Sequence, residues 1–206
     1  MASEVRTNKI SPATGTAFTI GDSGDTFTLP SGATLAVASG AAISNAGTAS
    51  GFGKVLQVVS TTKTDTFTTT SSTFVDLTGL SLNITPSSSS NKILIYFNFE
   101  SNTVETTNQV MSRLMRDATA IGVGDAAGSR TQTTTGMHAE TTGSIISSHA
   151  AHFLDSPSTT SSITYKVQVR CSVNGQTGYI SRTQTDVDNA NYSRSIATIT
   201  AMEIAG

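Results

Sequence analysis

Histidine is the residue type in this chain best suited to bind a metal ion, and the chain has three, His138, His149 and His152. A zinc site needs several such ligands around one ion. Positions 149 and 152 point to opposite faces if this segment is a strand, because side chains alternate along a strand. A single chain would then not bring both rings to one ion, whereas a ring of symmetry-related histidines on an oligomer axis could hold one. We expect hydrogen-bonded or solvated histidines, with no metal and no cofactor.

Ser23 is the candidate nucleophile, because Gly21-Asp22-Ser23-Gly24 is similar to the sequence around the active serine of trypsin-like proteases. Those enzymes have Gly at the next position, where this chain has Asp25, and their general-base histidine comes before the serine. All three histidines of this chain come far after Ser23. A nucleophile needs a base within hydrogen-bonding reach and an oxyanion hole, and the sequence indicates neither. We interpret the segment as a turn.

Carboxylates occur in two arrangements that could support chemistry. Residues 186–189, Asp-Val-Asp-Asn, have oxygen ligands at a spacing that Ca²⁺ accepts in surface loops, but they lack the Gly and Glu of an EF-hand. A solvated loop is the better interpretation. The pairs Asp117/Asp125 and Glu100/Glu105 could be imagined as the carboxylates of a glycosidase, yet Trp is absent and no aromatic platform accompanies them. We therefore expect no enzymatic activity.

Tyr and Arg, which are favoured in recognition surfaces, gather near the C-terminal end of the chain. Together with the acidic residues between them they predict a set of receptor-facing loop residues. These are Tyr179, Arg182, Asp186, Asp188, Tyr192 and Arg194. An exposed loop with ordinary charges explains the same residues. The single cysteine, Cys171, lies on the apolar face of a predicted strand, so we expect a small buried hydrophobic residue and no internal disulfide.

The composition is that of an all-β protein of one domain with an appendage. The chain has 206 residues, of which only 13% are charged, and its net charge is −2. This balance gives no electrostatic attraction to nucleic acid or to an anionic membrane. Ser and Thr make up about a third of the residues and favour turns and strands. The N-terminus lacks the apolar core of a signal peptide, and no run approaches ~18 apolar residues, so we expect a soluble protein without membrane insertion.

Residues 25–53 have a repeat-like pattern that one chain cannot bury. Their apolar side chains come in short groups separated by corners of small residues, and strands this short bury too little surface to offset the entropy of ordering them. The segment is either disordered or completed by other copies as an intertwined β-stalk. The predicted core of that stalk is Phe27, Leu29, Leu35, Val37 and Ile43.

The remaining chain divides into an arm and a compact domain. Residues 1–24 are polar with scattered apolar anchors, which is typical of a docking arm that is ordered against a partner. Residues 54–206 contain about eight to ten expected strands and no convincing helix, which predicts a two-sheet sandwich, specifically a jelly roll. The fold class we expect is all-β: an extended arm, an intertwined stalk and a C-terminal jelly-roll-like sandwich, assembled as a trimer.

Several strands of this domain have definite patterns. Residues 92–100 form the most apolar strand, which we expect to be central, and residues 163–173 alternate cleanly between apolar and polar. Asn174-Gly175 predicts a hairpin turn into residues 179–180. Residues 195–204 have two apolar faces, which predicts a strand that is central in a sheet or buried at a subunit contact.

A series of short motifs resembles tail-fibre-like virion proteins of marine and cyanobacterial bacteriophages. The motifs cover most of the chain and lie at residues 21–35, 53–59, 121–125, 153–157, 164–168 and 202–206. The resemblance implies a trimeric component of a phage particle, made in the host cytoplasm and located in the virion, with no catalytic residues. A short fibre, a fibre tip and a head or neck appendage are all compatible with it.

The sequence and the resemblance together predict multivalent attachment. An appendage of three copies gains avidity when three weak loop sites engage one cell surface, and loops within 122–143 and 174–194 would form its distal surface. The expected partners are other copies of this chain, virion proteins contacted through the arm, and a host surface glycan or protein. The alternative is a decoration or cement protein of the capsid or tail that contacts no host. A carbohydrate-active enzyme is the least favoured class.

Overall fold

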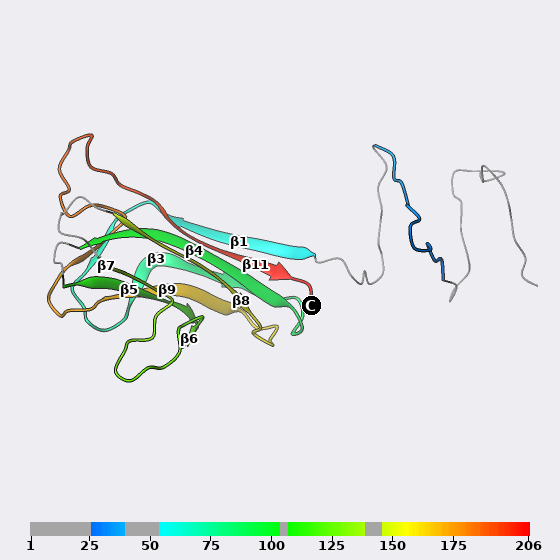
Figure 1. Ribbon diagram of the computed structural model, residues 1–206, viewed down its shortest axis with the longest axis horizontal. Coiled ribbons are helices and arrows are strands. Elements are labelled where there is room, and N and C mark those ends of the chain that lie inside the picture. Colours follow the sequence, from blue (N-terminus) through cyan, green and yellow to red (C-terminus); the bar gives the residue numbers. More distant parts are fainter. Residues whose placement is uncertain (1–25, 40–53, 104–106, 139–145) are drawn as a thin grey trace, which may run out of the picture. The chain divides into compact units, whose positions relative to one another are not determined.

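The structure is a computed structural model that describes residues 26–39, 54–103, 107–138 and 146–206 (Figure 1). The predictions for the arm at 1–24, Ser23, Ile43 and Glu105 lie outside the described residues. The chain divides into two units, Met1–Ser50 and Gly51–Gly206, and each is described by itself.

The described part of the first unit is an extended segment, residues 26–39, in which every residue is exposed. One turn interrupts it, where the Ala33 amide donates a hydrogen bond of 3.0 Å to the Pro30 carbonyl. Gly32 has a φ of 85° at the third position of this turn, a conformation that glycine adopts without steric cost. This turn, Pro30-Ser31-Gly32, is one of the corners of small residues that the sequence predicted between the apolar groups.

The second unit is a sandwich of two antiparallel sheets, and no helix occurs in its described residues. Sheet A consists of β1 (Val55–Lys63), β11 (Ala197–Ile204), β4 (Lys92–Thr103), β8 (Ser147–Asp155), β10 (Gly178–Ile180) and β2 (Phe67–Thr69). Sheet B consists of β3 (Val75–Ile84), β9 (Ile163–Cys171), β5 (Gln109–Arg116), β6 (Thr119–Ile121) and β7 (Thr135–His138). The predicted all-β sandwich is confirmed.

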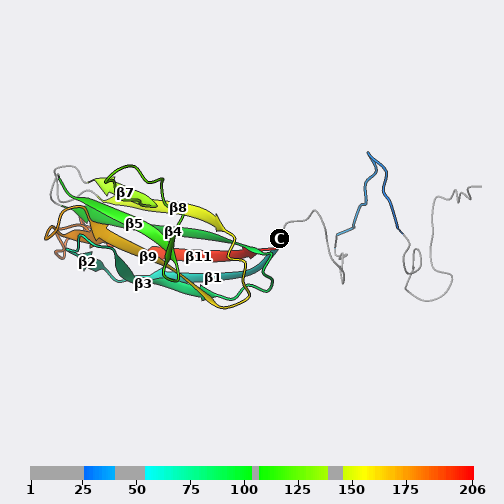
Figure 2. The ribbon, with the colours of Figure 1, turned by 90° about the horizontal axis from the view of Figure 1, so that it is seen from below.

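The order of the long strands is that of a jelly roll (Figure 2). One sheet runs β1-β11-β4-β8, because β8 pairs with the edge of β4 that β11 leaves free, and the other runs β3-β9-β5-β7. The first and last strands are therefore neighbours, and the strands between them cross repeatedly from one sheet to the other. This topology makes each sheet depend on segments from both halves of the domain.

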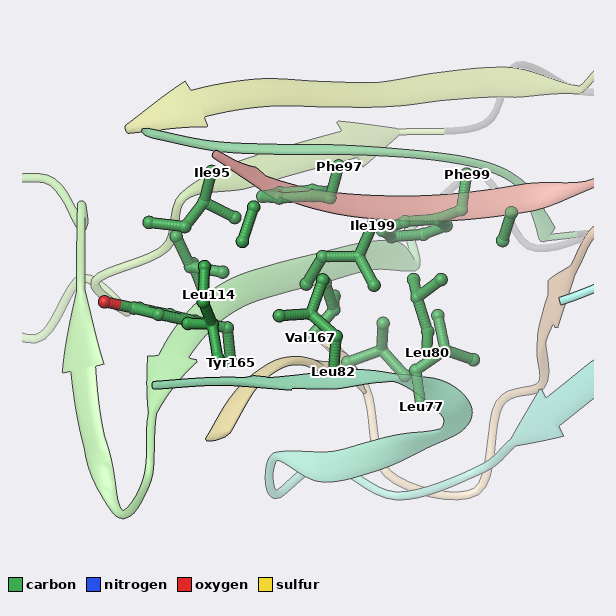
Figure 3. Packing of buried hydrophobic residues seen from close by; sticks show 14 of the residues in the cluster. Leu77, Leu80, Leu82, Ile95, Phe97, Phe99, Leu114, Tyr165, Val167 and Ile199 are labelled. Atoms are coloured by element: carbon green, nitrogen blue, oxygen red, sulfur yellow. The ribbon is translucent and has the colours of Figure 1, made fainter. Parts of the chain in front are cut away.

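The core lies between the two sheets because successive side chains of each strand point alternately inward and outward. In β9 the odd-numbered residues are buried and the even-numbered residues are half-buried, as the sequence predicted. The labelled side chains in Figure 3 come from both sheets and meet in the middle. They are Leu77, Leu80, Leu82, Ile95, Phe97, Phe99, Leu114, Tyr165, Val167 and Ile199.

Two predictions for individual strands are confirmed, and the prediction of a hairpin is wrong. β4 lies between β11 and β8, and β11 lies between β1 and β4, so both are central as expected. The predicted hairpin at Asn174-Gly175 is wrong. The turn exists, with Gly175 at a φ of 81°, but β9 and β10 belong to different sheets. Both edges of β9 are occupied, by β3 and β5, so the chain crosses to sheet A, where β10 pairs with β4 and β2.

The two ends of the sandwich differ. At the end where β1 begins, the entry end, the Ala205 amide donates to the Lys54 carbonyl at 2.9 Å, so β1 and the C-terminus lie together. At the opposite end, the far end, residues 181–196 form the loop that leads from β10 to β11 (Figure 1). Residues 122–134 instead connect β6, which pairs with the last residues of β5, to β7, which pairs with the first ones. They therefore run along sheet B and are not gathered at the far end.

Candidate functional site

The loop of residues 181–196, here called the far loop, is closed at its base. Arg182 and Arg194 form an isolated antiparallel bridge, and the Ser195 amide donates to the Ser181 carbonyl at 3.1 Å. We call these four residues the neck of the far loop. Because the backbone pairing brings both ends of the loop together, the residues between them project from the sandwich as one unit.

An ion-pair cluster stands on the neck. Asp186 accepts hydrogen bonds from Arg194 Nη2 at 2.8 and 2.9 Å and from Arg194 Nε at 3.1 Å, and Arg182 Nη1 lies 2.9 Å from Asp186 Oδ2. The hydrogen bonds from Arg194 hold the pKa of Asp186 below its usual range. The Arg182 guanidinium also lies 4.8 Å from the centre of the Tyr179 ring, a cation–π distance. The structure therefore brings together four of the residues predicted to face a receptor.

The far loop also lines an open, solvent-exposed pocket of about 460 Å³, a volume typical of small-ligand sites. Asp188 and Tyr192, the other two predicted residues, line it together with Asp186 and Arg194. A local turn shapes the wall, since Asn189 accepts hydrogen bonds from the amides of residues 191 and 192 at 2.9 and 3.1 Å. The pocket presents a phenol ring, carboxylate oxygens and guanidinium hydrogens, which suits binding of a polar ligand.

The far loop does not have the geometry of a calcium site. Both oxygens of Asp186 already accept hydrogen bonds from arginine, which leaves them no role as calcium ligands. In the part of the chain that the structure describes, no group of three His, Cys, Asp or Glu side chains converges to hold a metal ion.

His149 is buried, whereas His152 is exposed, so the two histidines lie on opposite faces of β8 as predicted. His149 Nε2 lies 2.8 Å from Ser101 Oγ in β4, and its Nδ1 lies 2.7 Å from Thr135 Oγ1 in β7. Its ring stacks on Phe99 at 4.4 Å. Burial lowers the pKa of His149 to about 3, so the ring is neutral and connects sheet A to sheet B.

A second polar cluster connects the sheets at the other end of β8. Arg116 in β5 donates to both oxygens of Asp155 at 2.8 and 3.0 Å, and the Tyr165 hydroxyl in β9 donates to Asp155 at 2.6 Å. Burial, and then the hydrogen bond to Asp155, raise the pKa of Tyr165. Sequence reasoning missed this cluster, although Asp155 stands out as a carboxylate that ends an apolar strand.

Glu203 is a buried carboxylate at the entry end. Its oxygens accept hydrogen bonds from Gln57 Nε2 at 2.6 Å, from the Ser87 amide at 2.6 Å and hydroxyl at 2.7 Å, and from Asn91 Nδ2. Burial alone would raise the pKa of Glu203, but these hydrogen bonds outweigh burial and hold the pKa at about 2. The carboxylate joins β11 to β1 and to the loop before β4, so its role is structural.

Cys171 and Asp117, two further candidates from the sequence, lie in settings that serve the fold. Cys171 is buried on the apolar face of β9, and burial raises the pKa of its thiol, so it is unsuited to nucleophilic chemistry. Asp117 accepts a hydrogen bond from the Thr164 amide at 2.9 Å within the turn that follows β5. Among the described residues, no helix is both long and apolar enough to cross a membrane.

Comparison with known proteins gives a slight likeness only. The sequence matches no protein-family model and no curated protein. Among the solved structures whose fold matches is a chain in the structure of infectious bursal disease virus Gt strain, with a TM-score of 0.39 and 12% sequence identity. The match covers 72% of this chain but 42% of that chain, so this chain spans less than half the length of its match. This is a distant likeness to a virus protein, and it carries no argument about function.

Proposed function

We propose that this chain is a non-enzymatic structural protein of a bacteriophage particle, a subunit of a trimeric tail-fibre-like or spike-like appendage that contributes to host attachment. Three elements support the proposal. The extended segment at residues 26–39 needs other chains to cover it, the sandwich forms a compact head, and the far loop offers a polar pocket at the end opposite to where the chain enters the head.

The observation that carries the proposal is the exposure of the apolar side chains in residues 26–39. Phe27 is 63% exposed, Leu29 42%, Leu35 62% and Val37 43%, although each pair recurs at alternate positions as in a strand with one buried face. An isolated linker has no need of apolar side chains at alternate positions. Three copies coiled around one axis would cover all of them, which is the arrangement that we propose for the stalk.

Attachment through the far loop follows from the position of the pocket. β1 begins at the entry end, so a stalk that precedes β1 would leave the far loop pointing away from the particle. Three pockets on one appendage would then bind one cell surface together, and the effective concentration of the second and third contacts would raise the total affinity. Residues 1–24 would dock the stalk to other virion proteins.

The mass in solution tests the stalk. Light scattering on a sizing column should give three chains, or a multiple of three, for the full protein, and a double variant Phe27→Ser, Leu35→Ser should weaken that association. The matched control is Thr28→Ser with Thr34→Ser, which alters polar neighbours in the same segment. A full chain that stays monomeric at micromolar concentration would overturn the trimeric appendage and favour a decoration protein that is ordered only on the particle.

Competition tests attachment. Purified protein should slow the adsorption of the phage particles that carry it to their host cells, because it occupies the same receptor. Tyr192→Ala should reduce this competition, since the ring lines the pocket, whereas Gly128→Ser, in an exposed loop away from the pocket, should not. If neither the wild-type protein nor the Gly128→Ser variant slows adsorption, that result would count against host binding and leave a purely structural role.

A further inference from the structure

The outer face of sheet A carries a row of apolar side chains that crosses four strands. Val58 in β1 is paired with Met202 in β11, Met202 with Leu94 in β4, and Leu94 with Leu154 in β8. Val58 is 56% exposed and Leu154 48% exposed, while the other two are half-buried. Paired side chains on one face of a sheet are direct neighbours. The four therefore form one continuous ridge on the surface, here called the apolar ridge.

A shallow hollow lies beside the apolar ridge. Its volume is about 280 Å³, and its floor consists of small or short side chains, Asn98, Ala150 and Thr198, which are paired across β4, β8 and β11. Tyr96 and His152 stand between the ridge and this floor, with ring centres 5.7 Å apart, and Tyr96 is 45% exposed. Along β4, Leu94 of the apolar ridge thus comes two residues before Tyr96, and Asn98 of the floor comes two residues after it.

On the outward face of β4, charged side chains occur only before residue 94 and after residue 98. The outward residues from 94 to 98 and their partners in the other three strands include no Asp, Glu, Lys or Arg. Lys92 lies at one end of the face and Glu100 at the other. The face is therefore uncharged in its middle and carries opposite charges at its two ends.

We propose that this face binds the same face of a second copy of the chain, with the two copies related by a two-fold axis through Tyr96. This rotation places each apolar ridge on the hollow of the other copy, because residues 94 and 98 are equally far from Tyr96. It also places Lys92 of each copy beside Glu100 of the partner subunit. A parallel arrangement around a three-fold axis would instead bring Lys92 together with Lys92 and Glu100 together with Glu100.

The area is sufficient for a specific contact. Four strands spaced ~4.8 Å apart, over nine residues that rise ~3.4 Å each, give a face of roughly 600 Å² per copy. Stable protein–protein interfaces bury about 800 Å² per partner, with weaker contacts below this value. Pairing through sheet A is thus expected to be reversible at micromolar concentration, with apolar residues at its centre and charges at its rim.

This contact is separate from the proposed stalk. The stalk alone gives three chains, the sheet A contact alone gives two, and both together give six, as in other assemblies that combine a three-fold with perpendicular two-fold axes. Failure of either proposal is therefore visible in the mass of the full chain. Three chains with no concentration dependence would overturn pairing through sheet A, and two chains would support it while overturning the trimer.

The first variant is Leu94→Glu, which places a charge in the middle of the contact without altering the core. It should raise the dissociation constant for pairing at least about tenfold, because the carboxylate would lose its hydration against apolar side chains. The control is Val187→Glu, which changes an equally simple apolar residue, 57% exposed, in the far loop. Circular dichroism should show that both variants are folded. Equal effects of the two substitutions, or none, would overturn the proposal.

Charge reversal tests the two-fold geometry. Lys92→Glu alone and Glu100→Lys alone should each weaken pairing, since each places like charges side by side, and the double variant should restore it. Restoration should fade at high salt, because exposed charges are screened. If the double variant pairs no better than the single ones, or if a trimer dissociates to single chains with Leu94→Glu, the two-fold arrangement is wrong.

Discussion

At the scale of single residues, Gly122 is constrained in two ways. Its backbone φ is 58°, a value that residues with a side chain rarely adopt, and a Cβ added at this position would lie 2.9 Å from the Phe153 ring. Gly128 has nearly the same φ of 59° with nothing within 4 Å of its would-be Cβ. We expect Gly122→Ala to lower the free energy of unfolding by about 2–4 kcal/mol and Gly128→Ala by about 1 kcal/mol. Urea unfolding measures both, and equal losses would show that the Phe153 contact has no cost.

The lowered pKa of His149 predicts how the free energy of unfolding depends on pH above the range where carboxylates titrate. Its pKa is about 3 when folded and about 6.5 when unfolded, so between these values only the unfolded chain takes up the proton. The stabilisation is complete above pH 6.5 and falls as the pH decreases, by about 1.4 kcal/mol per unit. His149→Gln, which retains hydrogen-bonding groups but does not titrate, should flatten the decline between pH 6.5 and 5.5 in urea unfolding. An unchanged slope in the variant would assign the decline to other groups.

The sequence predicted the environment of the histidines only in part. Alternation along a strand was enough to separate His149 from His152. The partners of His149 were not predictable, because Ser101 and Thr135 come from strands in different sheets, and alternation says nothing about which strands pair. In the far loop, the gathering of Tyr and Arg predicted a recognition surface, which stays a prediction, and it did not indicate that Asp186 would be held by two arginines.

At the scale of secondary-structure elements, Glu203 fixes β11 to its surroundings. We expect Glu203→Gln to lower the free energy of unfolding by about 2–3 kcal/mol, because an amide NH₂ would face donors that now bind a carboxylate oxygen. Asp188→Asn, in the exposed far loop, is the control and should change stability by less than about 0.5 kcal/mol. Chemical denaturation at pH 7 compares them. The difference should shrink as the pH falls from 4.5 toward 2, because the unfolded chain then takes up a proton on Glu203 while the folded chain keeps the carboxylate ionised.

Strands were predictable where one short pattern determines them. The apolar pattern of residues 163–171 agrees with β9, and the tight turn between β5 and β6 falls at Asp117-Ala118, where Asp117 has a φ of 51°. The hairpin after β9 failed for a different reason. Asn-Gly reports a turn, but whether two strands then pair depends on the free edges of the sheet, and that is decided by β3 and β5, from distant parts of the chain.

At the scale of the whole molecule, the sandwich contains its entire buried core. All residues of the core cluster lie between Leu77 and Ala201, so a chain that starts at Lys54 should fold without the preceding residues. We expect its urea midpoint to match that of the sandwich transition in the full chain, compared at concentrations where both are single chains. Tryptophan is absent, so far-UV circular dichroism is the suitable signal. A truncated chain that is unfolded would mean that residues before 54 complete the sandwich.

The jelly-roll topology could be anticipated from the number and pattern of strands, but assembly could not. The second apolar face of residues 195–204 allowed either a central strand or a subunit contact. In the structure β11 is central, and Met202 still contributes to the apolar ridge on the outer face. The first interpretation is therefore confirmed, and the subunit contact belongs to the proposal for sheet A.

The neck of the far loop, together with Asp186, makes the residues between Asp186 and Arg194 exchangeable. Because Arg182 and Arg194 hold the loop ends together, lengthening the loop adds only the slowly growing entropy of a longer closed chain, roughly 0.6 kcal/mol for each doubling. Both termini of the sandwich lie at its other end, so an inserted peptide would meet neither of them. The domain should therefore tolerate inserted residues at one tip, and it would serve as a scaffold on which foreign peptides are displayed.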